Sequence, residues 1–138
     1  MNKISDDILC KVEKPSRYVG GELNQVIKNP KDVDIRFAFC FPDVYEVGMS
    51  HLGTRILYHT INLREDTYCE RTFAPWPDME ELMRKNNIPL YTLETKDSLD
   101  KFDILGFTLQ YEMSYTNILN MLDMSGIPFR ASERGEDD

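Results

Sequence analysis

The stretch at residues 34–53, DIRFAFCFPDVYEVGMSHLG, decides the fold because it joins the most strand-like run of the chain to a helix through a tight turn. Residues 35–41 are apolar or small except for Arg36, a pattern typical of a strand that is buried on both faces. Pro42 ends this strand because proline cannot donate to a central hydrogen-bond ladder. Gly48 and Gly53 bracket a segment that opens an amphipathic helix running to about Leu63. In a parallel α/β sheet, such a turn lies at the edge where ligands bind.

The rest of the chain repeats the order strand then helix. Further strands are predicted at residues 68–73, 88–93 and 104–109. The order predicts an α/β fold of the Rossmann-like or flavodoxin-like type, with a parallel sheet of about four strands and helices on both faces. We expect the strands to lie in the order third, second, first, fourth. This places the apolar fourth strand at an edge, so either residues 127–130 cover it or the native protein continues past Asp138.

Cap signals mark the two later helices. Asp78 and Glu81 have the spacing of a capping box, and Asn86 and Asn87 end the helix that follows. Ser114 is expected to cap the last helix, which should end at Gly126 in a left-handed conformation. The residues of this helix that we expect to point inward are Ile118, Leu119 and Leu122.

Residues 1–33 differ from the remainder and predict an N-terminal arm that contains a short helix, ahead of an α/β domain at residues 34–138. Ser5 is placed to cap the short helix, and Pro15 ends it. The arm then continues through a Gly-Gly pair without a clear period. It is either an extended lead-in or a lid or docking strap, for which the candidate contacts are Arg17, Tyr18 and Glu22.

Length and charge exclude several classes. A chain of 138 residues suits one domain, and its formal net charge of −8 with a pI near 4.8 argues against a nucleic-acid surface or an anionic membrane as partner. No apolar run approaches the roughly 20 residues that span a bilayer, and the amino terminus is too charged for a signal peptide. We therefore expect a cytoplasmic protein with no membrane and no nucleic-acid partner.

The cysteines and histidines predict neither disulfides nor a metal site. Cys10, Cys40 and Cys69 are widely spaced and odd in number, so we expect free thiols. His51 and His59 are eight positions apart, too far to share one helix face on adjacent turns.

The candidate site lies where the first and fourth strands end, because their outgoing turns should face each other across one crevice. The first turn supplies the candidate cofactor-binding residues Pro42, Asp43, Tyr45, Glu46, Gly48, His51 and Gly53. The fourth strand and its turn supply Gly106, Thr108, Gln110, Tyr111, Glu112 and Ser114. We predict no catalytic residue.

The chemistry of these turns excludes some ligands. The Gly-x-Gly-x-x-Gly loop of a dinucleotide site is absent, and Asp43 and Glu46 repel the phosphate of a flavin mononucleotide. An acidic magnesium pocket stays open as an alternative, since Glu112 joins these two carboxylates to supply part of one.

Three phrases carry a resemblance: DIRFAFCFPDVYEVGMSHLGTRILYHTIN, CERTFAPWPDMEELMRKNNIPLYTLET and FDILGFTLQYEMSYTNILNMLDMSGIP. Together they resemble the N-terminal, cobalamin-binding-like domain of a bacterial radical SAM protein family of uncharacterised function. The resemblance implies a domain incomplete at its C-terminus, with cobalamin as its cofactor. It also implies a partner, a barrel domain of the same full-length chain, where a Cys-x-x-x-Cys-x-x-Cys motif would hold a 4Fe-4S cluster and S-adenosylmethionine. An exposed fourth strand would in addition favour self-association of this fragment.

One departure limits the resemblance. Cobalamin domains that ligate cobalt use Asp-x-His-x-x-Gly, but this chain has Met49 and Thr54 at the aspartate and glycine positions around His51. We therefore expect His51 to be structural, bonded to a neighbouring carbonyl or carboxylate.

Two hypotheses follow from the resemblance. In the first, the chain is an N-terminal accessory, cofactor-binding domain of a radical SAM iron-sulfur enzyme. In the second, it is a vestigial, non-binding structural cap or interaction domain that shapes the substrate site of the barrel. The first needs a floor of small residues at Gly48, Gly53 and Gly106. Four aromatic residues could fill that space instead, and we expect them to pack in the core: Tyr45, Trp76, Tyr111 and Tyr115.

Overall fold

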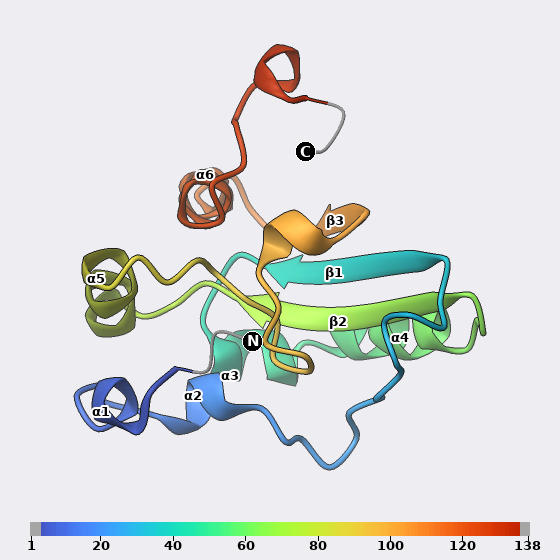
Figure 1. The fold of residues 1–138 in the computed structure, drawn as a ribbon, viewed down its shortest axis with the longest axis horizontal. Helices are drawn as coiled ribbons and strands as arrows, with labels where there is room; N and C mark the ends of the chain where they lie inside the picture. Colours follow the sequence, from blue (N-terminus) through green and yellow to red (C-terminus); the bar gives the residue numbers. More distant parts are fainter. Residues whose placement is uncertain (1–3, 136–138) are drawn as a thin grey trace.

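The computed structural model describes residues 4–135, and a parallel sheet of three strands lies at its centre (Figure 1). Strand β1 (Ile35–Phe41) lies between β2 (Thr67–Phe73) and β3 (Ile104–Phe107). In the register, Ile35 is opposite Thr67 and Phe37 is opposite Ile104. The α/β class, the parallel pairing and the relative order of these strands are confirmed, but the sheet has three strands, not about four.

The predicted strand at residues 88–93 does not form. Pro89 has no N–H to donate, and the N–H of Leu90 donates to the carbonyl of Met124, 3.1 Å away, instead of to a neighbouring strand. The segment runs beside β2 and gives it one backbone hydrogen bond, from Leu93 N to Arg71 O at 2.8 Å. Tyr91 forms only an isolated antiparallel bridge with Ser98. The short 3-10 helix η1 (Leu99–Lys101) then leads to β3.

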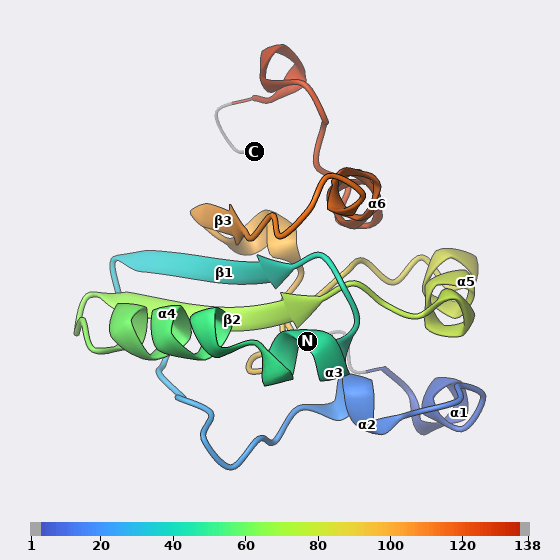
Figure 2. The same cartoon turned by 180° about the vertical axis from the view of Figure 1, so that it is seen from behind.

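The single helix predicted after the first strand is two helices, α3 (Tyr45–Ser50) and α4 (Leu52–Asn62). They are separated at His51, whose backbone is extended (ψ 115°). The imidazole Nδ1 accepts the N–H of Thr54 at 3.1 Å, so the side chain replaces the hydrogen bond that a continuous helix would make. Helix α4 packs on one face of the sheet (Figure 2), where Tyr58 joins a core cluster with Phe39 and Cys69.

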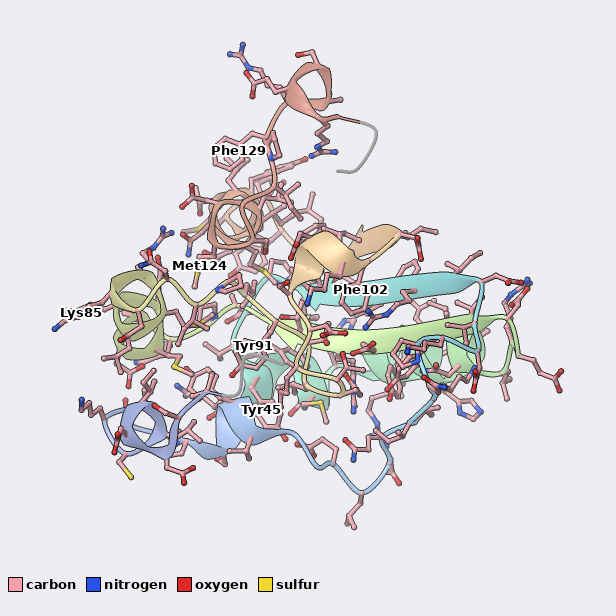
Figure 3. The ribbon with its side chains drawn as sticks, viewed as in Figure 1. Tyr45, Lys85, Tyr91, Phe102, Met124 and Phe129 are labelled. Atoms are coloured by element: carbon pink, nitrogen blue, oxygen red, sulfur yellow. The ribbon has the colours of Figure 1, made fainter. Side chains whose placement is uncertain are left out.

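The opposite face of β1 meets the other helices. Ala38 and Cys40 belong to a core cluster that also contains methionines from α5 (Pro77–Lys85) and α6 (Ser114–Met124). Both helices lie beside the carboxyl ends of the strands (Figure 1), and Figure 3 shows Met124 between them. Ile8 of α1 (Asp6–Leu9) adds to the same cluster. The core on this second face therefore combines methionines of two helices with Leu90, Tyr91 and Leu99 from the segment before β3.

The helix starts differ from the cap predictions. Trp76 is the N-cap of α5, and Asp78 makes no capping box: its carboxylate accepts from the N–H of Met79 and from the N–H of Glu13 in the arm. Ser114 is the first residue of α6 and does not cap it. The helix ends as predicted, before Gly126 with φ of 71°. Leu119 points outward instead of inward, and the chain continues to a short 3-10 helix, η2 (Ala131–Glu133).

The arm is fastened to the domain at both ends. Near its start, α2 (Ser16–Val19) carries Tyr18, whose hydroxyl accepts the N–H of Trp76 at 3.1 Å. Farther along, the N–H of Val26 donates to the hydroxyl of Tyr58 at 2.8 Å. The ammonium of Lys28 donates to three carbonyls between the end of α4 and the start of β2, those of Asn62, Arg64 and Thr67. The arm thus lies along the α4 side of the sheet.

Strand β3 forms one edge of the sheet, and it is shorter and more exposed than predicted. It ends at Phe107, and Ile104 is exposed. Among residues 4–135, no strand pairs with its outer edge. Residues 127–130 do not pair with it either, although Ile127 lines a cavity of about 300 Å³ next to Leu105 and Phe107.

Across the same described range, no helix has the length and apolar character needed to cross a membrane.

Candidate functional site at the carboxyl edge of the sheet

The turns that follow β1 and β3 meet at the carboxyl edge of the sheet. Gln110 Nε2 lies 3.5 Å from His51 Nε2, and Asn117 Nδ2 donates to the carbonyl of Pro42 at 2.8 Å. The N–H of Thr108 points to the carbonyl of Cys40, 3.4 Å away. Because β1 and β3 are neighbours, the two predicted halves of the site form one continuous edge, as expected.

The acidic side chains at this edge do not converge. Glu46 forms salt bridges with Arg17 at 2.9 Å and Lys14 at 3.3 Å, and Asp43 accepts the N–H of Val44 at 2.7 Å. Desolvation acts to raise the pKa of Glu46, but hydrogen bonds, including those from Arg17 and Lys14, hold it below its ordinary value. Glu112 is exposed. Within residues 4–135, no group of three or more His, Cys, Asp or Glu side chains could hold a metal ion.

The three glycines proposed as a cofactor floor are each covered by a ring. A Cβ atom at Gly48 would lie 2.2 Å from the ring of Phe73, and one at Gly106 would lie 2.4 Å from the ring of Phe37. At Gly53 it would meet the imidazole of His51 at 2.8 Å. These glycines permit close packing of rings, so the expectation that they leave open space is wrong. The residues present do not form the broad floor that a corrin ring needs.

The aromatic residues at this edge are more exposed than predicted. Tyr45 is half-buried, but Trp76, Tyr111 and Tyr115 are exposed, so core packing was the wrong expectation for these three. Tyr111 and Tyr115 lie close in sequence to Met113, which is 77% exposed, and to Leu109. We call these four residues the carboxyl-edge apolar surface: Leu109, Tyr111, Met113 and Tyr115.

His51 has a structural role at this edge. Its ring caps α4 through Nδ1 and lies 5.4 Å from the ring of Phe41, centroid to centroid. The bond differs from the one expected, because the partner is a backbone N–H and not a carbonyl or carboxylate. Gln110, which faces Nε2, is the only polar side chain with a contact to that nitrogen among the described residues.

Comparison with known protein families finds a match over residues 53–138 to the family described as radical SAM proteins, N-terminal. The chain belongs to this family. The matched segment runs from the second residue of α4 through β2, α5, β3 and α6, and so includes the carboxyl-edge apolar surface. Searches among curated proteins and among solved structures found no match.

Two charged residues at the centre of this radical SAM N-terminal domain were not among the residues predicted from the sequence. Glu70 and Arg71 lie in the middle of β2, which is buried along its whole length. Arg71 Nε donates to Glu94 Oε1 at 2.8 Å, and Arg36 Nη2 donates to Glu70 Oε1 at 2.7 Å. The available signal was the Glu-Arg pair inside the strand predicted at residues 68–73, because charges in a buried strand are retained where they are paired.

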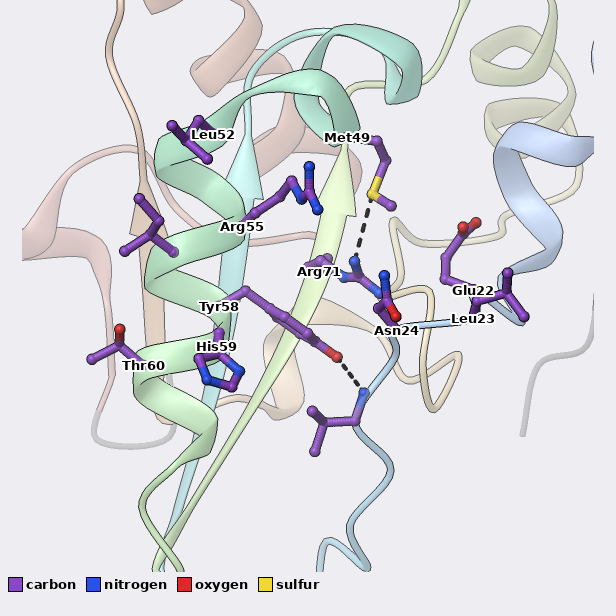
Figure 4. Close-up of a pocket in the computed structure, with 12 residues that line it drawn as sticks. Glu22, Leu23, Asn24, Met49, Leu52, Arg55, Tyr58, His59, Thr60 and Arg71 are labelled. Carbon is purple, nitrogen blue, oxygen red and sulfur yellow. Dashed lines mark hydrogen bonds between the residues drawn. The ribbon is translucent and has the colours of Figure 1, made fainter.

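A second missed feature is a cavity of about 660 Å³ on the α4 side of the domain, between α4 and the arm (Figure 4). Its polar lining residues are Glu22, Asn24, Arg55, Tyr58, His59, Thr60 and Arg71. Glu22 is thus the one predicted arm contact that lines this cavity. Arg17 and Tyr18 contact Glu46 and Trp76 instead.

Proposed function

We propose that this radical SAM N-terminal domain is an accessory domain of a radical SAM iron-sulfur enzyme, acting as a structural cap. It would pack against the catalytic domain of the same protein, where the 4Fe-4S cluster and S-adenosylmethionine are expected. The observation that carries the proposal is the carboxyl-edge apolar surface, in which Met113 is 77% exposed. Family membership supports a linked catalytic domain as the occupant of this surface.

The exposed apolar side chains of this surface favour contact with a partner. Contiguous apolar side chains on a soluble domain mark interaction sites, because each square ångström removed from water contributes about 25 cal/mol. Tyrosine and methionine suit such a surface, since tyrosine combines a large apolar area with a polar end and methionine adapts to irregular contacts. Ser114 is buried and starts α6, so the end of the surface is anchored to a rigid helix.

Amide hydrogen exchange tests this proposal. Turn residues 109–113 should exchange slowly in the whole protein and quickly in the isolated 138-residue chain, because only the whole protein contains the partner. The amides of β1 provide the control, since this central strand should be equally protected in both. Equal, rapid exchange of residues 109–113 in the two proteins would contradict the cap. As a second test, Met113→Glu should restore rapid exchange in the whole protein, whereas Leu23→Glu on the exposed arm should not.

A cofactor-binding domain is the second candidate, and one observation favours it. Thr108 Oγ1 is buried at the carboxyl edge and has no hydrogen-bond partner among the described residues, so it is placed to bond a ligand there. Cobalamin would bring polar amide groups to this edge, but the rings of Phe37 and Phe73 would have to move away from the glycines that they cover.

Titration of the whole protein with hydroxocobalamin tests this second candidate. If it binds, Thr108→Val should weaken the binding, while His51→Ala should leave the cobalt spectrum unchanged because that histidine caps α4. No spectral response at high micromolar cofactor would leave the cap as the supported function. A change of the cobalt spectrum in His51→Ala would show that the histidine is a ligand.

A further inference from the structure

The cavity between α4 and the arm is large enough for a small molecule. Its volume of about 660 Å³ lies within the roughly 300–1,000 Å³ typical of ligand pockets. Its walls come from four parts of the chain: the arm near Leu23, Met49 of α3, the side of α4 that carries Leu52 and Ile56, and Arg71 of β2. Figure 4 shows Arg55 and Arg71 directed toward the space between α4 and the arm.

Arg71 has hydrogen-bond donors that the protein does not use. Its side chain is only 6% exposed, and Nε is bonded to Glu94. Nη1 contacts the sulfur of Met49 at 3.6 Å, a weak acceptor, and Nη2 has no acceptor among the described residues. The guanidinium lies 4.1 Å from the centroid of the Tyr58 ring, which holds it in place. A buried donor without an acceptor is costly, so this cavity wall is suited to an oxygen-bearing ligand.

Further hydrogen-bonding groups come from α4. Arg55 and His59 are four residues apart, so they lie on the same side of the helix, and both line the cavity. In the part of the chain that the structure describes, Arg55 forms no salt bridge. The nearby carboxylates are already engaged: Glu94 binds Arg71, and Glu22 accepts the hydroxyl of Tyr45. The positively charged groups left available to a ligand are therefore Nη2 of Arg71 and the guanidinium of Arg55.

Besides the polar residues Asn24 and Thr60, the remaining lining is apolar and comes from Leu23, Val26, Met49, Leu52 and Ile56. We propose that the cavity binds a small organic anion, with a carboxylate or phosphate group on Arg71 and Arg55 and an apolar body along α4. Met49 lies against the guanidinium, and its flexible side chain can move aside to admit the anionic group. The site is separate from the carboxyl-edge apolar surface, so it does not depend on the proposed cap.

Calorimetric titration with three eight-carbon probes tests the charge requirement. Octanoate and octyl phosphate should bind at least about tenfold more tightly than 1-octanol, because only the anions accept charge-assisted hydrogen bonds from the arginines. Arg55→Gln should weaken octanoate binding by about fivefold, as expected for a partly exposed ionic contact. Arg130→Gln removes the same charge from an exposed arginine outside the cavity and should have no effect.

The position of the site is tested separately by methyl NMR of methionine-labelled protein. Octanoate should shift the Met49 methyl signal and leave Met121, which is buried in the other core cluster, unchanged. Arg71→Lys should abolish the shift, and Arg55→Gln, whose side chain is exposed, should reduce it without risk to folding. Any one of three results would overturn the proposal. The first is equal affinity for octanoate and 1-octanol, and the second is a loss of octanoate affinity in Arg55→Gln no larger than in Arg130→Gln. The third is a Met49 methyl signal that octanoate does not shift.

Discussion

Glu70 and Arg71 are neighbours in β2, yet their side chains leave opposite faces of the sheet and bind the same loop, residues 92–95. Glu70 accepts from the hydroxyls of Thr92 and Thr95, both at 2.6 Å. Arg71 donates to Glu94 through its side chain and through its backbone N–H. The side chains of both carboxylates are 0% exposed, so buried hydrogen bonds to Glu70 and the ion pair of Arg71 with Glu94 fasten the loop to the strand in place of a strand ladder.

Removing Glu94 should strongly destabilise the fold. Glu94→Ala leaves the buried Arg71 without its carboxylate, and we expect a loss of about 3–5 kcal/mol in the free energy of unfolding, measured with urea. Asp123→Ala is the matched control, because its salt bridge with Arg84 is on the surface and should contribute less than about 1 kcal/mol. Losses of similar size in the two variants would show that the buried pair has no special weight.

The three cysteines should react at very different rates. Cys10 is exposed, whereas Cys40 and Cys69 are buried, and burial raises the pKa of both buried thiols, that of Cys69 to about 12. A thiol reagent added to the folded 138-residue chain should therefore modify one cysteine quickly and the other two only after unfolding. Cys10→Ser should remove the fast phase. A fast phase that persists in this variant would contradict the burial of the other two thiols.

Lys96 should make stability depend on pH above neutrality. Its ammonium donates to the carbonyls of Leu93 and Tyr18, and burial lowers its pKa from 10.5 to about 8. Between these two values the unfolded chain binds a proton that the folded chain does not, so this lysine makes folding more favourable as the pH rises. Wild type should therefore gain stability relative to Lys96→Met between about pH 8 and about pH 10.

The comparison of these two proteins isolates the lysine. The buried thiols of Cys40 and Cys69 act in the opposite direction, since their raised pKa values make folding less favourable at high pH, but they are present in both proteins. Urea unfolding at several pH values gives the difference directly. A free energy of unfolding of wild type that stays constant or falls with rising pH, relative to that of Lys96→Met, would contradict the lowered pKa of Lys96.

The free edge of β3 should cause the isolated chain to self-associate. Ile104 is exposed on an edge strand, and such edges pair with other chains unless a charge blocks them. Sedimentation should show dimers or larger species that increase with concentration, and Ile104→Lys should shift the chain toward monomer. Ile27→Lys alters an exposed residue of the arm and serves as control. A wild-type chain that remains monomeric at high concentration would refute this expectation.

Much of the sheet could be predicted from the apolar pattern alone. Ile35–Phe41 forms a strand with the expected bounds, and β1 pairs with β3 as its apolar character suggested. The segment at residues 88–93 has a similar apolar content, but its backbone groups bond to Met124, Asp97 and Arg71. These partners are distant in sequence or set by a local turn, so no periodicity in the segment itself could indicate them.

At the candidate site, too, the arrangement of the strands could be predicted from the sequence, whereas the packing of side chains could not. Strand order was enough to predict that His51 and Gln110 would approach each other. Whether Gly48 and Gly106 were open depended on the rings of Phe73 and Phe37, which come from other strands. The cavity beside α4 was missed because Arg55, Arg71 and the arm come together only through tertiary packing.

The family match begins at Gly53, inside α4, whereas β1 ends at Phe41. Yet β2 and β3 both pair with β1, which lies between them. A gene fragment that started at the matched boundary would encode two strands without the one that joins them, and parallel strands two places apart are separated by about 10 Å. Recombination between codons 41 and 53 would therefore separate the central strand β1 from both of its neighbours. A gene fragment that encodes the complete sheet must begin before β1, upstream of the segment at residues 53–138 that matches the family.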